Sequence, residues 1–136
     1  MKYNPSISLR LFAIGIVLLL GGCQGFDEGP VISIYPVEDR IKNTWKWASA
    51  REDGVNLTGI LADSTIEFGA RDVLKVCAQT GGCREGSWTL ISKNEEVQII
   101  FGRQATAYVI QRLTRKELWL RHQGASLVEW QLKPVE

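Results

Sequence analysis

Histidine and cysteine are scarce in this chain, which has one histidine, His122, and three cysteines among its 136 residues. A Ser-His-Asp type of triad needs a histidine beside a nucleophile and a carboxylate, and a zinc site needs three or four His, Cys or carboxylate ligands in close array. His122 falls at the end of a predicted strand, where a surface position is the simpler interpretation. Glycine-rich loops between a strand and a helix, which cradle nucleotides, are also missing. We therefore expect no enzyme activity, no metal site and no cofactor.

An excess of charge of one sign is also missing. Sixteen basic residues stand against 15 acidic ones, and 14 basic residues remain once Lys2 and Arg10 near the N-terminus are set aside. No block of like charges extends beyond a few residues, and the chain has no low-complexity tract or internal repeat. A near-neutral chain without a basic patch is not expected to bind nucleic acid.

The longest apolar run, Leu11–Leu20, is too short to span a membrane as a helix. A spanning helix needs about 20 apolar residues, and this run has ten. Basic residues precede the run and Leu20-Gly21-Gly22-Cys23 follows it, which is typical of a cleaved export signal. The last four residues resemble the lipobox of bacterial lipoproteins, in which an aliphatic residue and two small residues precede a cysteine. We expect residues 1–22 to be a signal peptide and Cys23 to carry the lipid, the alternative being an ordinary signal with an incidental cysteine.

Cleavage before Cys23 would leave 114 residues, enough for one domain. Residues 23–36 contain two glycines and two prolines without helical periodicity, which indicates a tether, and residues 37–136 would form the folded part. Gln24 stands after the cysteine, where an aspartate retains many lipoproteins in the inner membrane. We therefore expect a protein of the cell envelope, anchored by lipid to the outer membrane.

The two other cysteines, Cys77 and Cys83, are six positions apart. An exported chain reaches an oxidising compartment, where such a pair is expected to form a disulfide. The residues between them, Ala-Gln-Thr-Gly-Gly, have the composition of a turn, and the Cys-x-x-Cys pattern of redox sites is missing. The spacing therefore predicts a structural disulfide that closes a hairpin.

Beyond a helical turn expected over residues 37–42, apolar and polar residues alternate with a period of two in short runs from Trp45 to Leu132. Turn-forming residues separate these runs at intervals near ten residues. The pattern predicts an all-β fold of about eight short antiparallel strands. Closure into an up-and-down barrel removes exposed strand edges and is favoured over a two-sheet sandwich. The aromatic residues expected inside the barrel are Trp45, Trp47, Trp88, Tyr108 and Trp130.

These inward aromatic side chains have two possible roles. Ligand pockets are rich in aromatic residues, but an eight-stranded barrel is only wide enough for its own side chains or one small ligand. Short strands and four indoles favour a filled core. The fifth tryptophan, Trp119, is predicted to face outward together with Arg121. It is a candidate for a cation–π pair or an interface anchor, although packing against the barrel end is the simpler interpretation.

Three short motifs resemble the small lipocalin-like lipoproteins of Gram-negative bacteria. They are Gly86-x-Trp88-x-Leu90, Tyr108-x-Ile110-x-x-Leu113-Thr114 and Leu118-x-Leu120, within a region from about Arg40 to Leu132. Asn43 stands where those proteins have a glycine two residues before the first strand tryptophan. The resemblance implies an exported up-and-down barrel with a short helical turn at one end, and it implies no particular activity.

Two functions are compatible with such a barrel. The first is a non-catalytic binding module for a small apolar ligand, favoured by the resemblance and by the inward aromatic residues. The second is an interaction module for an envelope protein, such as a periplasmic protease or lysozyme inhibitor, with a filled barrel. An interior cavity above about 300 Å³ would favour the first function. A packed interior with an exposed apolar patch would favour the second.

Overall fold

The structure is a computed structural model that describes residues 35–136. The expected signal peptide (1–22), Cys23 and the tether up to residue 34 lie outside the described residues. The described part contains one short α-helix, α2 (Val37–Ile41), and one 3-10 helix, η1 (Ala70–Asp72). None of the helices in this part is long and apolar enough to cross a membrane.

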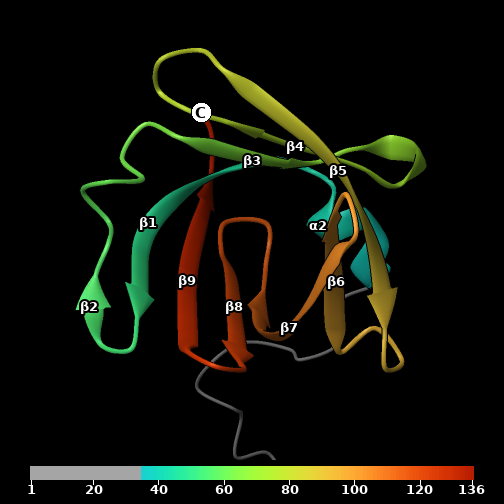
Figure 1. The fold of residues 1–136 in the computed structure, drawn as a ribbon. Helices are drawn as coiled ribbons and strands as arrows, with labels where there is room; N and C mark the ends of the chain where they lie inside the picture. The colour runs from blue at the N-terminus through green and yellow to red at the C-terminus, as the bar shows by residue number, and fades with distance from the viewer. Residues whose placement is uncertain (1–34) are drawn as a thin grey trace, which may run out of the picture. The chain divides into compact units, whose positions relative to one another are not determined.

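The remaining regular structure is a single antiparallel sheet that closes on itself (Figure 1). Its strands are β1 (Thr44–Glu52), β2 (Val55–Asn56), β3 (Thr65–Phe68), β4 (Val73–Cys77), β5 (Cys83–Ile91), β6 (Glu96–Phe101), β7 (Gln104–Leu113), β8 (Leu118–Gln123) and β9 (Leu127–Pro134). Each strand from β3 to β9 pairs with the next, and β1 pairs with both β3 and β9. The predicted all-β, eight-stranded up-and-down barrel is therefore confirmed. The sequence did not predict β2, which pairs with β1 outside the ring.

The end of the barrel where β1 begins is packed against α2, and we call it the helix end. The helix begins after Pro36, contains an ion pair between Glu38 and Lys42 (2.7 Å) and ends at Lys42, which is extended. Ile41 is completely buried, and its carbonyl oxygen accepts a hydrogen bond from the indole N–H of Trp45 (3.0 Å). The helical turn predicted from the sequence is confirmed. Its Ile41 side chain joins the hydrophobic core at the helix end of the barrel.

The opposite end, which we call the disulfide end, includes the hairpin between β4 and β5. Cys77 and Cys83 are the last pair of this ladder and form the predicted disulfide, with Cα atoms 4.1 Å apart. The next pair, Ala78 and Gly82, makes the backbone hydrogen bond (2.8 Å), so the cysteines occupy a non-hydrogen-bonded site, where facing Cα atoms lie closest. Gly81 has a positive φ of 89° in the turn, which glycine adopts without strain.

Large apolar side chains fill the barrel toward the helix end. Trp45 is completely buried and Trp88 is 2% exposed. The indole N–H of Trp88 donates a hydrogen bond to the carbonyl oxygen of Gly69 (3.1 Å), and its ring meets Phe68 edge-on at 5.6 Å between centroids. Buried indoles normally have a partner for their N–H group, and both of these do. This half of the barrel is the filled core that the sequence favoured.

Candidate functional site

Toward the disulfide end, the interior of the barrel contains a cavity of about 350 Å³. Eight of its eleven lining residues are aliphatic or aromatic; the full set is Trp47, Leu61, Ile66, Val76, Arg84, Ile99, Phe101, Gln104, Thr106, Tyr108 and Trp130. Arg84 and Gln104 are exposed to solvent, so the cavity reaches the surface. The expectation of a fully filled core is therefore wrong for this half. The indoles of Trp47 and Trp130 line the space instead of filling it.

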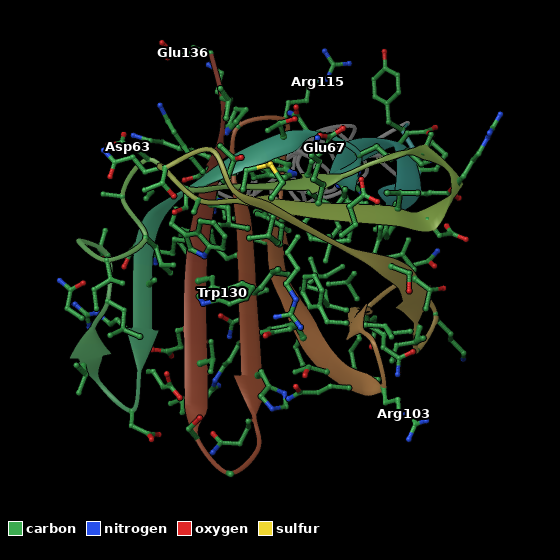
Figure 2. All side chains as sticks on the ribbon, turned by 45° about the horizontal axis from the view of Figure 1, so that its top comes forward. Asp63, Glu67, Arg103, Arg115, Trp130 and Glu136 are labelled. Carbon is green, nitrogen blue, oxygen red and sulfur yellow. A yellow bond between two sulfur atoms is a disulfide. The ribbon has the colours of Figure 1, made fainter. Side chains whose placement is uncertain are left out.

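One wall of the cavity is a series of aromatic rings contributed by β1, β9 and β7. Trp47 meets Trp130 edge-on, with centroids 5.6 Å apart, and Trp130 stacks on Tyr108 at 4.8 Å. Figure 2 shows Trp130 extending from β9 into the barrel. The His122 ring packs against Tyr108, with centroids 5.5 Å apart, but is not part of the cavity lining. Because aromatic pairs restrict each other's orientation, the rings form a wall of fixed shape for a flat or flexible apolar ligand.

Burial raises the pKa of the Tyr108 phenol above its ordinary value, and the carboxylate of Glu52 raises this pKa further. Tyr108 is 8% exposed, so its ring contributes apolar surface to the cavity. At neutral pH the phenol is therefore uncharged, and this wall carries no negative charge from Tyr108.

The N–H group of Trp47 differs from those of the tryptophans in the filled half. Trp47 is 8% exposed, its Nε1 atom is buried, and this donor has no hydrogen-bond partner in the described part of the chain. An unpaired buried donor destabilises a protein by about 1–3 kcal/mol. The cavity wall therefore contains a hydrogen-bond donor that no group of the described residues satisfies.

Gly86, the glycine of the Gly-x-Trp motif, leaves room for the ring of Phe101, which lines another side of the cavity. A Cβ atom at this position would overlap the carbonyl oxygen of Ile100 and lie 2.8 Å from Cδ1 of Phe101. Glycine therefore allows the ring of Phe101 to pack directly on the backbone of β5. The guanidinium of Arg84 lies over the same ring, 4.5 Å from its centroid. Gly86 thus leaves room for the Phe101 ring, which lies beneath the Arg84 guanidinium in the cavity lining.

Polar groups at the disulfide end are distributed unevenly. Glu52 accepts a hydrogen bond from the Ser126 hydroxyl (3.0 Å), and Asp53 accepts one from the backbone N–H of Leu127 (2.8 Å). These contacts tie the turn after β1 to the turn before β9. Arg84, by contrast, makes no hydrogen bond or ion pair within residues 35–136. Its guanidinium instead makes the cation–π contact with the Phe101 ring.

Two further residues singled out from the sequence need correction. His122 is half-buried rather than on the surface, and its Nδ1 lies 2.8 Å from the carbonyl oxygen of Ala107. Trp119 does face outward, but the cation over its ring is Arg112, at 5.2 Å, and not Arg121. Arg112 also pairs with Glu117. Neither aromatic side chain contributes to the cavity.

Residues 35–136 contain no cluster of three or more His, Cys, Asp or Glu side chains that could hold a metal ion. The cavity lining offers apolar contact, one cation and a few hydrogen-bond donors.

No protein-family model matches the chain, and no curated protein matches it by sequence. Among solved structures, the chain is similar to a lipocalin-like protein from Bacteroides uniformis ATCC 8492. The TM-score is 0.55 at 14% identity, and the match covers 71% of this chain and 99% of the other. At this identity the match shows the fold alone. The chain thus has the closed, eight-stranded antiparallel barrel of a lipocalin-like protein, as the Gly86-x-Trp88 motif implied.

Proposed function

We propose that this chain is a non-catalytic binding protein, whose barrel holds a small apolar ligand in the cavity toward the disulfide end. The observation that carries the proposal is the cavity itself, about 350 Å³ and lined mostly by aromatic and aliphatic side chains. Its volume is at the lower end of the range for small-molecule pockets, about 300–1,000 Å³. A site of this size suits one compact ligand.

A titration with the neutral fluorophore N-phenyl-1-naphthylamine tests this proposal. The dye brightens in apolar surroundings, and we expect one molecule to bind per barrel. Thr106→Phe should block the cavity and weaken binding at least about tenfold, the effect of losing roughly 1.4 kcal/mol of contact. Val109→Phe adds the same side chain to an exposed position of the same strand, where 46% of Val109 is accessible, and should leave binding unchanged. Equal binding by both variants would contradict the proposal.

An interaction with an envelope protein is the second candidate, because two apolar side chains are strongly exposed beyond the end of β1. Ile60 is 78% exposed and Val55 is 62% exposed. Replacing both with serine would weaken a protein partner while leaving the dye affinity unchanged. This second function does not require a filled barrel, since both residues lie outside the cavity lining.

We also propose that the barrel is held at the outer membrane by lipid on Cys23. The support is the lipobox-like sequence Leu20-Gly21-Gly22-Cys23 after a ten-residue apolar run. Acyl chains anchor a protein by about 0.8 kcal/mol per buried CH₂ group, and two chains or more hold it firmly. Fractionation of cell envelopes, followed by mass spectrometry of the N-terminal peptide, tests this part.

A further inference from the structure

We infer that the ligand is an amphiphile, with an apolar body in the cavity and one anionic head group, such as a carboxylate, on Arg84. This inference rests on the proposed binding function and adds the chemical class of the ligand. It follows from the position of one cation at the mouth of an otherwise uncharged cavity.

Arg84 is the one charged residue among the eleven that line the cavity. It lies on β5 opposite Val76, two residues before Gly86 and four before the buried Trp88, so it shares their inward face. Its guanidinium packs over the Phe101 ring, which restricts its position. Each N–H group of an arginine is a donor in a planar fork that fits the two oxygens of a carboxylate.

The guanidinium of Arg84 has no anionic partner among residues 35–136. Arg84 forms no ion pair or hydrogen bond with any residue of the described part, whereas Arg112 and Lys42, on the outside of the fold, each pair with a glutamate. An arginine that faces a binding cavity without a carboxylate beside it is available to an anion from solution.

The other polar groups around the cavity are consistent with an acceptor on the ligand. Trp47 carries an unpaired buried N–H, and Gln104 and Thr106 supply an amide and a hydroxyl from β7. No acidic residue lines the cavity, and the nearby Glu52 is already hydrogen-bonded to Ser126. The lining therefore offers donors and positive charge, which favour an anionic ligand over a neutral or cationic one.

Two matched fluorescent probes test the inference. N-phenyl-1-naphthylamine and 1-anilinonaphthalene-8-sulfonate share one apolar body and differ by a single sulfonate group. We expect the full-length mature protein to bind the sulfonate at least about tenfold more tightly, the factor that one charge-assisted hydrogen bond supplies at an accessible site. Raising the salt concentration should reduce the difference, because screening weakens exposed ionic contacts.

Variants of Arg84 assign the effect to this residue. Arg84→Gln should remove the preference, so that this variant binds the sulfonate and the neutral probe with affinities within about twofold of each other. Arg84→Lys, which keeps the charge, should retain part of the preference. Arg103→Gln is the matched control, because Arg103 is an exposed arginine in the neighbouring hairpin and does not line the cavity (Figure 2).

The outcomes distinguish failure of the inference from failure of the proposed function. Binding of both probes with equal affinity, or a sulfonate preference that survives Arg84→Gln, would overturn the inference while the binding function stands. No binding of either probe in the cavity would overturn both. Competition extends the test to natural head groups: dodecanoate should displace the sulfonate probe at lower concentration than dodecanol does, and equal displacement would count against an anionic ligand.

Discussion

Replacing Trp88 with alanine should remove one of the two tryptophan side chains that fill the helix end of the barrel. Trp88 is 2% exposed, its ring packs edge-on against Phe68, and its N–H is bonded to the Gly69 carbonyl oxygen. Loss of a buried aromatic side chain destabilises a protein by about 3–5 kcal/mol, through lost burial and the cavity left behind. Since domains of this kind are typically stable by about 5–15 kcal/mol, the variant should unfold at much lower denaturant concentration.

Two further variants separate the contributions to this loss. Trp88→Phe keeps an aromatic ring beside Phe68 but leaves the Gly69 carbonyl without its donor, so it should cost less, about 1–3 kcal/mol. Trp119→Ala removes an outward indole that is only partly buried and packs under Arg112, and it should cost about 1 kcal/mol.

Denaturant unfolding monitored by circular dichroism measures all three free energies of unfolding. The expected order of destabilisation is Trp88→Ala, then Trp88→Phe, then Trp119→Ala. Equal losses at positions 88 and 119, or a larger loss at 119, would refute the assignment of inward and outward faces to these strands.

The other predictions concern processing, the disulfide and alkaline stability. Cys23→Ser should leave an unlipidated, uncleaved precursor, detectable by its mass, and normal processing of this variant would contradict the lipobox interpretation. Reduction of the Cys77–Cys83 disulfide should lower the free energy of unfolding by about 2 kcal/mol without loss of the fold, because the closed loop is short. The raised pKa of Tyr108 means that the folded protein holds this proton more tightly than the unfolded chain, so its contribution to stability is present below pH 10 and is lost as the pH rises further. Tyr108→Phe should therefore flatten the alkaline part of the stability profile, and an unchanged profile would show that another group is responsible.

The inward and outward faces of the barrel could be predicted from the sequence, because side chains alternate across a strand with a period of two. The same rule, extended by one or two steps, would have predicted an inward position for Arg84, which was not a candidate site residue, and for His122, which was assigned to the surface. Counting back from Trp88 through Gly86 reaches Arg84, and counting forward from Leu118 and Leu120 reaches His122. Both residues share the parity of buried neighbours.

Other features depend on local irregularities that alternation does not encode. From Tyr108 and Ile110, the period of two would turn Arg112 inward, but the β7–β8 ladder shifts register between Ile110 and Arg112. This irregularity places Arg112 over the outer face of Trp119. A similar shift in β1 lies between Trp47 and Ser49. The alternation of side chains likewise does not predict the cavity, because the presence of a cavity depends on how much of the interior volume the side chains occupy.

Nuclear magnetic resonance of the five tryptophan indole N–H groups tests the central claim of a ligand cavity most directly. Each indole gives its own signal in a nitrogen-15 correlation spectrum, and the five lie in three different environments: the filled core, the cavity wall and the outer surface. On titration with the sulfonate probe, we predict large shifts for Trp47 and Trp130 and small ones for Trp45, Trp88 and Trp119. Shifts confined to Trp119, or none at Trp47 and Trp130 under saturating probe, would contradict binding inside the barrel.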